Sequence, residues 1–251
     1  MITLKSKQDI DKMRVVNSMV AKVLNMLKKE IKPGITTYDL DRLAVEYSKN
    51  LNAKPAFLGY GGFPNALCVS VNEEVVHGIP SKKKFLKEGD IVSLDFGLFY
   101  DGFYGDSAIT VGVGSVSKIK QKLMDVTKNS LYKGIEQAYP GNYLFDISKA
   151  VQMHVELNGF SVVRDYVGHG IGRNLHEEPQ VPNYVPDRGR NILLQLGMTI
   201  AIEPMVNMGS FEIEVKKDGW SVVTKDRLPS AHFEHTIAIL EDGPIILSKE
   251  N

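Results

Sequence analysis

Two strand-like segments joined by an Asp-Gly pair constrain the fold of this chain more than any other feature of its sequence. Residues 91–98 and 103–111 are rich in β-branched and aromatic side chains, and Asp101-Gly102 lies between them. Such a dipeptide favours the two-residue turn that joins antiparallel strands. The sequence therefore predicts a β-hairpin whose turn sets the pairing of its two strands.

Two acidic residues share one face of this hairpin. Counting back from the turn places Asp95 opposite Ala108. It places Asp106 opposite Gly97, so the two acids are diagonal neighbours, about 7 Å apart at the backbone. The other face is apolar and carries Val92, Leu94, Phe96, Ile109 and Val111. Two like charges this close repel each other unless a cation neutralises them. For this pair alone, a metal site and a solvated hairpin with ordinary surface acids both stay open.

The second half of the chain repeats these segments. Residues 89–95 and 106–111 match residues 197–203 and 234–239. Glu203 and Glu234 therefore stand where the first copy has Asp95 and Asp106. If the two copies pack face to face, all four acids point into one central hollow. Four unrelated surface acids would not explain this repetition.

Each copy also begins with two amphipathic helical patterns that a Pro-Gly pair separates. The expected helices cover residues 6–30, 37–51, 117–138 and a stretch ending near 158, and further strands cover 67–71 and 160–167. No linker composition divides the two copies. We therefore expect a single domain over residues 1–251, with half-repeats at about 6–114 and 117–247. The fold class is α+β, with a curved antiparallel sheet that carries helices on its outer face.

A histidine between glycines adds a fifth potential ligand. His169 lies in Gly168-His169-Gly170-Ile171-Gly172, where the glycines let the backbone approach a site closely. Their spacing is not that of a dinucleotide loop, and residues 176–180 miss the H-E-x-x-H pattern at the last position. Four carboxylates and one imidazole suit Mn(II), Fe(II), Co(II) or Zn(II). So much negative charge indicates two cations rather than one, and hydrolysis is the natural chemistry of such a pair.

The charge balance and the cysteine content disfavour several other classes of protein. Lys and Arg together number 30, as do Asp and Glu, so no net field attracts nucleic acid or an anionic membrane. The single cysteine, Cys68, excludes an internal disulfide framework and a Cys-based zinc finger. The sequence shows no signal-peptide pattern and no apolar run of membrane-spanning length. We expect a cytoplasmic protein that binds neither nucleic acid nor membrane directly.

Several motifs together resemble the type I methionine aminopeptidases of the bacterial kind, over essentially the whole chain. They are Val75-Val76-His77-Gly78-Ile79-Pro80, Leu94-Asp95 with Asp106 further on, Gly168-His169-Gly170-Ile171-Gly172, His176-Glu177-Glu178-Pro179, Ile202-Glu203-Pro204-Met205 and Phe233-Glu234-His235-Thr236. The resemblance implies the pita-bread fold and a single catalytic domain. It also implies a metalloprotease that removes the N-terminal, initiator methionine from nascent proteins and peptides. The cofactors would be two divalent ions: Co, Mn, Fe or Zn.

The resemblance also implies a role for each ligand. Asp106 and Glu234 would bridge the two ions, while His169 and Glu203 would complete one ion and Asp95 the other. A hydroxide that bridges the ions would attack the first peptide carbonyl, and Glu203 would relay its proton. The free α-amine of the substrate would bind a metal ion, which explains why only the terminal residue is removed.

Two more histidines and an apolar pocket would contact the substrate. By the same resemblance, His176 steadies the developing oxyanion and His77 contacts the substrate amide. The methionine side chain would lie among Phe57, Tyr60, Phe63, Cys68 and Trp220. Leu175 departs from the pattern, because several relatives carry Phe there. His232 replaces an expected glutamine and should point to the same side as Glu234, so it should affect metal affinity or the pH profile.

Two other functions fit parts of the pattern. Proline-specific peptidases resemble the same catalytic unit but usually bring an extra N-terminal domain, whereas the first helix is expected here from residue 6. A metal-free binding protein on the same scaffold would have lost ligands, and all five are present. As partners we expect the N-terminal methionine of nascent peptides and, transiently, the ribosome. We expect the protein to be a monomer.

Overall fold

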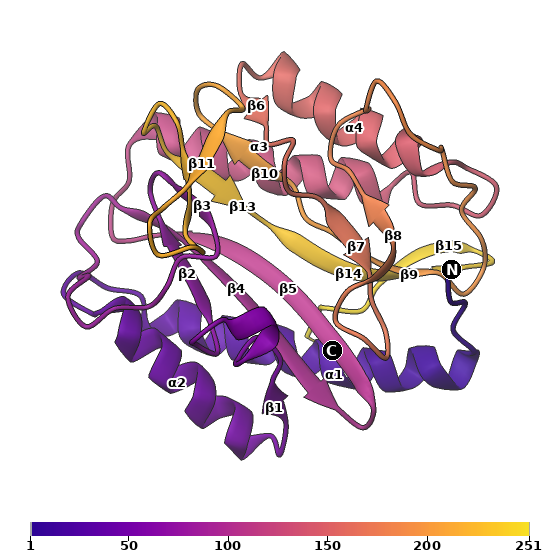
Figure 1. Cartoon of the computed structure of the whole chain (residues 1–251), viewed down its shortest axis with the longest axis horizontal. Coiled ribbons are helices and arrows are strands. Elements are labelled where there is room, and N and C mark those ends of the chain that lie inside the picture. The colour runs from indigo at the N-terminus through magenta and orange to yellow at the C-terminus, as the bar shows by residue number, and fades with distance from the viewer. Residues whose placement is uncertain (1, 251) are drawn as a thin grey trace.

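A curled sheet of nine strands forms the centre of the molecule in the computed structural model, which describes residues 2–250 (Figure 1). Seven strands follow the order β1-β4-β5-β14-β9-β7-β8, while β2 pairs with β4 and β15 pairs with β14. These pairings are antiparallel. The strands are β1 (Lys54–Pro55), β2 (Cys68–Val71), β4 (Ile91–Tyr100), β5 (Phe103–Gly112), β7 (Gly168–Gly170), β8 (Glu177–Val181), β9 (Thr199–Ile202), β14 (Glu234–Leu240) and β15 (Gly243–Ile246).

Within residues 2–250, two small sheets and four α-helices surround the central sheet. The small sheets have the orders β13-β10-β6 and β11-β12-β3. Their strands are β3 (Glu74–Val76), β6 (Ser161–Val162), β10 (Met205–Asn207), β11 (Ile213–Val215), β12 (Val222–Thr224) and β13 (Ser230–His232). The helices are α1 (Lys7–Glu30), α2 (Thr37–Asn50), α3 (Lys118–Ile135), α4 (Leu144–Leu157) and a short 3₁₀ turn, η1 (Tyr60–Gly62). In Figure 1, α1 and α2 lie below the sheet and α3 and α4 lie above it. The expected α+β architecture is confirmed.

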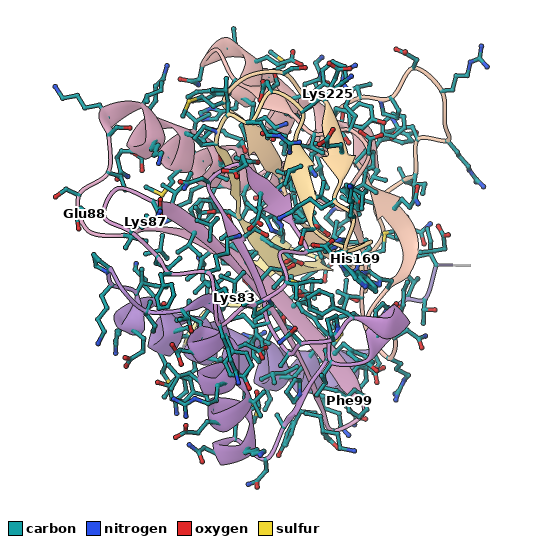
Figure 2. The ribbon with its side chains drawn as sticks, turned by 60° about the vertical axis from the view of Figure 1, so that its left-hand side comes forward. Lys83, Lys87, Glu88, Phe99, His169 and Lys225 are labelled. Atoms are coloured by element: carbon teal, nitrogen blue, oxygen red, sulfur yellow. The ribbon has the colours of Figure 1, made fainter. Side chains whose placement is uncertain are left out.

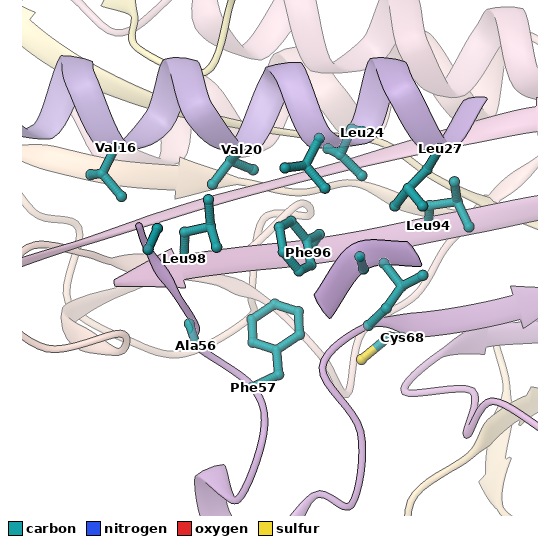
Figure 3. Close-up of a cluster of buried hydrophobic side chains, with 14 of the residues drawn as sticks. Val16, Val20, Leu24, Leu27, Ala56, Phe57, Cys68, Leu94, Phe96 and Leu98 are labelled. Carbon is teal, nitrogen blue, oxygen red and sulfur yellow. The ribbon is translucent and has the colours of Figure 1, made fainter. Parts of the chain in front are cut away.

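Helix α1 forms and docks as its sequence indicates. The Ser6 side chain accepts a hydrogen bond from the Asp9 N–H at 3.2 Å, and the Asp9 carboxylate accepts one from the Ser6 N–H at 3.1 Å. This reciprocal capping satisfies N–H groups that have no partner within the helix. The apolar stripe then packs on β4, where Val20 and Leu24 lie beside Phe96 (Figure 3). Burying each such side chain contributes about 1.5–3 kcal/mol, so the contact fixes the helix on the sheet.

The hairpin of β4 and β5 has the predicted register. The observed pairs include Tyr100 with Phe103, Asp95 with Ala108 and Asp106 with Gly97. Asp101 and Gly102 have φ values of 45° and 81°, as a two-residue turn of this kind requires at both positions. Because neighbouring side chains alternate between faces, the acids point away from α1.

The second copy of the hairpin differs in register from the first. In the ladder of β9 and β14, Ile202 pairs with His235, which brings Glu203 level with Glu234. The first copy instead holds its two acids diagonally. The ladder stops at Ile202 because Pro204 follows Glu203 and has no N–H to donate. The sequence repeat is therefore not a strict repeat of strand pairing.

The strand expected over residues 160–167 is wrong in its extent. Only Ser161–Val162 forms a strand, β6, and it pairs with β10 in a small sheet. Gly168–Gly170 forms β7, which belongs to the central sheet. The intervening residues leave one sheet and enter the other, so a single straight strand cannot cover the whole segment.

The central sheet combines strands from both halves of the chain. Strand β5 pairs with β14, and Glu234 lies opposite Ala108 in that ladder. This pairing brings together the hairpins that carry the repeated acids. Among residues 2–250, no helix has both the length and the apolar character needed to cross a membrane.

Candidate metal centre and substrate pocket

The predicted metal ligands, the two substrate-contacting histidines and the predicted methionine-pocket residues all line one pocket. These are Phe57, Tyr60, Phe63, Cys68, His77, Asp95, Asp106, His169, His176, Glu203, Trp220 and Glu234. Gly61 and Leu175 complete its lining. Residues that are far apart in sequence therefore meet as the face-to-face packing of the two copies predicted.

Five consecutive strands of the central sheet each present one polar side chain to this pocket. Asp95 comes from β4, Asp106 from β5 and Glu234 from the start of β14. Glu203 directly follows β9, and His169 is the middle residue of β7. These five strands are neighbours in the order β4-β5-β14-β9-β7, so the curl of the sheet turns their side chains toward one another.

Three of these side chains converge closely enough to share one cation. Single ligand atoms of Asp106, His169 and Glu234 all lie within 4.8 Å of one another. His169 Nε2 is 3.9 Å from Asp106 Oδ2 and 3.6 Å from Glu203 Oε1. Asp106, His169 and Glu234 are buried, and Figure 2 labels His169 among the surrounding side chains.

The four carboxylates stand in a strongly unfavourable environment for negative charge. Burial raises the pKa of Asp95 to about 7. Burial, reinforced by the charge of Asp95, raises the pKa of Asp106 well above its usual value. Burial and the neighbouring carboxylates likewise raise the pKa of Glu203 and of Glu234. Bound cations would reverse this effect by stabilising the ionised forms.

The hydrogen bonding within the site fits a metal centre. Among residues 2–250, Asp95 Oδ1, Asp106 Oδ1 and Glu234 Oε1 are buried without a hydrogen-bond partner. His169 Nδ1 donates to the Gly170 carbonyl at 2.9 Å, which leaves the lone pair on Nε2, the atom that faces the carboxylates. Such a set of oxygen atoms plus one imidazole nitrogen suits Mn(II), Fe(II), Co(II) or Zn(II). The residues present therefore fit a divalent metal ion.

Side chains hold the backbone of the acidic strands in place where the ladder of β5 and β14 ends. The Thr236 hydroxyl donates to the Asp106 carbonyl at 2.8 Å, and the Ser107 hydroxyl donates to the Glu234 carbonyl at 2.7 Å. On the other side of β5, Asn17 Oδ1 accepts the Asp106 N–H at 3.2 Å. These bonds fix Asp106 and Glu234 relative to each other through their main chains.

Two histidines flank the carboxylates. His77 lies in a loop with a φ of 57°, an unusual value for a residue that is not glycine, and its ring meets Tyr166 edge-on at 5.3 Å. Burial lowers the pKa of His77 to about 4, so its ring is neutral at ordinary pH. The His176 Nδ1 is hydrogen-bonded to the Tyr60 hydroxyl at 2.7 Å, and its ring lies 4.3 Å from that of His169. Both imidazoles are therefore held in fixed orientations at the pocket.

Aromatic side chains form the apolar part of the pocket. Phe63 and Trp220 meet edge-on with ring centres 5.3 Å apart. Phe57 and Cys68 are both buried (Figure 3). Cys68 lies opposite Asp95 in the ladder of β2 and β4. Tyr60 is 43% exposed, which places it at the mouth of the pocket. The apolar wall thus lies directly beside the carboxylates.

The two departures from the expected pattern both lie at the site. Leu175 is buried and lines the pocket. His232 is also buried, and its Nε2 is 3.6 Å from Glu203 Oε2. Neither ring nitrogen of His232 has a hydrogen-bond partner in the described part of the chain.

The sequence did not indicate three residues that support the site. Asn17 contacts the Asp106 main chain, Asp41 accepts the N–H groups of residues 66 and 67 behind the pocket wall, and Lys5 pairs with Glu177 beside His176. Asn17 and Asp41 are polar residues on the buried faces of amphipathic helices, and this conflict with the apolar pattern is a signal that sequence can supply. Lys5 carries no such signal.

The comparisons with known proteins agree on one family. Residues 11–241 match the profile of metallopeptidase family M24. The chain is 51% identical to the methionine aminopeptidase of Clostridium acetobutylicum over 249 residues, which cover 99% of each protein. Its structure matches that of the methionine aminopeptidase from Thermotoga maritima with a TM-score of 0.96 and 51% identity, over 100% of both chains.

A more distant likeness concerns the fold alone. The prolidase from Pyrococcus furiosus matches with a TM-score of 0.80 at 22% identity, over 99% of this chain and 66% of that one. The pita-bread fold that the sequence implied is therefore confirmed.

Proposed function

The chain belongs to metallopeptidase family M24, and from that premise we propose how its pocket carries out catalysis. Its activity is that of a methionine aminopeptidase, as in relatives that share about half of its residues over nearly the full length. The observation that carries the mechanism is the convergence of four buried carboxylates and one imidazole beside an apolar, aromatic pocket.

We propose that Asp95, Asp106, His169, Glu203 and Glu234 would hold two divalent ions, with Asp106 and Glu234 as the ligands that the ions would share. The unpartnered buried carboxylate oxygens and the fixed tautomer of His169 support this assignment. Two such ions, when bound, activate a water molecule as the nucleophile and polarise the substrate carbonyl. The side chains of the protein perform the remaining tasks.

Glu203 is the proposed proton carrier. It lies at the end of β9, 3.6 Å from His169, and faces the pocket. Its carboxylate is buried beside Asp95 and Asp106, so it can accept a proton within the pocket and return it there. It is therefore suited to take a proton from the nucleophile and to deliver it to the leaving amine.

His176 and His77 are the proposed contacts to the substrate. His176 is held by Tyr60 through Nδ1, so its Nε2 is free to face the substrate carbonyl and stabilise the oxyanion. His77 is neutral and held against Tyr166, so it can exchange a hydrogen bond with the substrate amide. Both roles require fixed imidazoles, and the aromatic contacts provide them.

The apolar wall is the proposed binding site for the methionine side chain. Phe57, Tyr60, Phe63, Cys68 and Trp220 line the pocket on this side. Aromatic rings contact thioether sulfur favourably, by about 0.3–1.5 kcal/mol for each contact. Selectivity for methionine then follows from the shape of this apolar wall and from the contacts of its aromatic rings with sulfur.

The setting of the enzyme follows from its substrate. We propose that both half-repeats form one catalytic domain, because the central sheet takes ligand strands from each half. We also propose a monomer that meets nascent chains in the cytoplasm, with transient contact to the ribosome. A buried free cysteine is compatible with a reducing compartment.

Hydrolysis of two peptides tests this function. With Mn(II), Co(II), Fe(II) or Zn(II) added in turn, Met-Ala-Ser should lose its methionine and Ala-Pro-Ala should stay intact. Cleavage of Ala-Pro-Ala in preference would indicate a proline-specific peptidase, and cleavage of neither peptide with any metal would indicate a binding protein. Elemental analysis of the protein purified without added metal should identify the ion and give about two per chain.

A further inference from the structure

A buried lysine near the N-terminus forms an ion pair beside the pocket. Lys5 Nζ donates to Glu177 Oε2 at 2.5 Å and to the Thr3 carbonyl at 3.0 Å. Only 4% of the Lys5 side chain and 10% of the Glu177 side chain are exposed. The Lys5 N–H also donates to the Gly197 carbonyl at 2.7 Å, so the backbone at this residue is fixed as well.

A pair this deeply buried needs a reason other than stability. Removing two charges from water costs about as much as their attraction returns, and apolar residues often serve stability equally well. Removing one partner, by contrast, leaves the other charge buried without a partner, which is strongly destabilising. The pair therefore specifies a local geometry, and the position of Glu177 indicates which one.

Glu177 holds the loop that ends at His176. Its second oxygen, Oε1, accepts the Asn174 N–H at 3.1 Å. The loop also packs directly on the ion pair, because a Cβ on Gly172 would lie 2.4 Å from Lys5 Cε and 2.9 Å from Glu177 Oε1. A side chain at residue 172 would therefore displace the Lys5 ammonium from its place beside Glu177. The backbone of residues 172–176 is thus fixed from the side of Lys5.

The same ion pair lies next to His176 in the chain. Glu177 is the first residue of β8 and pairs with Gly170 of β7, so the loop between them is closed at its base. His176 immediately precedes Glu177; its ring lies 4.3 Å from that of His169, and its Nδ1 is hydrogen-bonded to the Tyr60 hydroxyl. A displacement of Glu177 would therefore move the His176 ring relative to the pocket.

From these contacts we propose that Lys5 is a positioning residue for His176 and acts through Glu177. The inference rests on the proposed function, since it takes His176 to be the group that stabilises the oxyanion. Lys5 then contributes to turnover without touching the substrate. An ion pair that only stabilises the fold would leave kcat of the folded enzyme unchanged.

The first test compares Lys5→Met with Lys7→Met. Lys7 is exposed at the start of α1, so its variant is the matched control. With Met-Ala-Ser, Lys5→Met should lower kcat about tenfold, because small displacements of catalytic groups cost this much or more. KM and metal affinity should stay within about twofold. Unchanged kcat, or a loss explained by weaker metal binding, would overturn the proposal.

The second test asks whether the effect passes through His176. In a His176→Ala background, adding Lys5→Met should cause no further fall in kcat, since the positioned ring is already gone. A fall by the same factor in both backgrounds would show that Lys5 acts elsewhere. If Lys5→Met does not fold, the double variant Lys5→Met with Glu177→Gln is used instead. It removes both charges of the ion pair, and it takes the place of Lys5→Met in each comparison.

A spectroscopic test does not depend on activity. The chain has six histidines, so histidine labelling gives few ring resonances in an NMR spectrum of the metal-free protein. Lys5→Met should shift the ring resonance of His176 and leave that of His154, on α4, in place. An unmoved His176 resonance would contradict the proposal. Failure of the wild-type protein to cleave Met-Ala-Ser would instead refute the proposed function and leave this structural result standing.

Discussion

Asn17 of helix α1 accepts the main-chain N–H of Asp106 at 3.2 Å, which ties a helix on one face of the sheet to an acid that points from the other. Its Nδ2 group donates to the Met13 carbonyl at 2.9 Å, so both ends of the amide are used. A buried asparagine on an otherwise apolar stripe is thereby explained. The backbone of Asp106 is held where β14 no longer pairs with it.

Replacement of Asn17 tests this relationship. Asn17→Ala leaves the Asp106 N–H without a partner and should destabilise the protein by about 1–3 kcal/mol. Metal affinity should fall as well, because Asp106 loses its anchor. Thermal unfolding and metal titration measure the two effects. Asn25→Ala, at an exposed position of the same helix, is the control and should change neither.

The acids themselves carry a stronger prediction. Asp106→Asn and Glu234→Gln should each abolish turnover of Met-Ala-Ser, because each removes a charge proposed to contact both ions. Asp101→Asn, at the exposed turn of the same hairpin, should keep full activity. Activity and bound metal are measured side by side. Full activity of Asp106→Asn in metal-controlled buffer would rule out its bridging role.

The charge of the site predicts how stability depends on pH. A carboxyl group whose pKa is raised on folding holds its proton to higher pH in the folded state, so stability falls as pH rises through the folded value. For Asp95 that value is about 7. Burial lowers the pKa of His169 and of His232 to about 3, so the stability that these groups contribute grows as pH rises to about 6.5, the pKa of a free histidine, and is constant above it.

Above pH 6.5 the raised pKa values of the carboxylates lower stability as pH rises, and the raised pKa of the buried Cys68 thiol acts in the same direction near pH 8.5. Protein treated with a chelator should therefore melt at a lower temperature at about pH 8.5 than at about pH 6.5. Metal-loaded protein should show a smaller difference, because bound cations keep the carboxylates ionised in the folded state. Calorimetry of both forms at the two pH values measures this. Equal shifts in the two forms would argue against a metal at these carboxylates.

His232 is predicted to act on metal affinity rather than on the pH profile. Burial and the charge of His77 lower its pKa to about 3, so its ring does not titrate in the working range of pH. It lies 3.6 Å from Glu203 Oε2, within reach of a hydrogen bond after a small movement. His232→Leu should weaken metal binding roughly tenfold, and His232→Gln less, because Gln retains a donor. Both should keep the shape of the pH–rate curve, and unchanged metal binding in His232→Leu would dismiss the role.

Asp41 is predicted to shape the methionine pocket. Its carboxylate accepts the Ala66 and Leu67 N–H groups at 2.8 and 3.0 Å, next to Cys68. Asp41→Ala should raise KM for Met-Ala-Ser roughly fivefold, since the wall of the pocket loses its support. Glu46→Ala, at an exposed position of the same helix, is the control. Lower thermal stability with unchanged KM would show that Asp41 serves the fold alone.

Local chemistry made part of this structure predictable from sequence. Asp101-Gly102 sets the register of the whole hairpin because the turn is local and its backbone conformation is restrictive. Ser6 and Asp9 mark the start of α1 for the same reason. The repeat then predicts the positions of Glu203 and Glu234, so the sequence alone indicates that the four carboxylates lie together.

Contacts between distant segments were not predictable in this way. Lys5 meets Glu177 and Asn17 meets Asp106 only after the sheet has assembled, and neither pair follows a spacing rule. The strand expected over 160–167 was too long because its residues divide between two sheets. The repeat likewise could not show that Glu203 lies level with Glu234, since Pro204 ends that ladder.

The central place of β14 has a consequence for synthesis of the enzyme itself. This strand pairs with β5 and β9, between the two halves of the sheet, and it supplies Glu234, yet it occupies Glu234–Leu240, close to the C-terminal end of the sequence. Strand pairing over such long separations in sequence is slow to form. A ribosome must therefore deliver residues up to Leu240 before the sheet can close, and a translation product that stops before β14 lacks both the strand that joins the two halves of the sheet and Glu234.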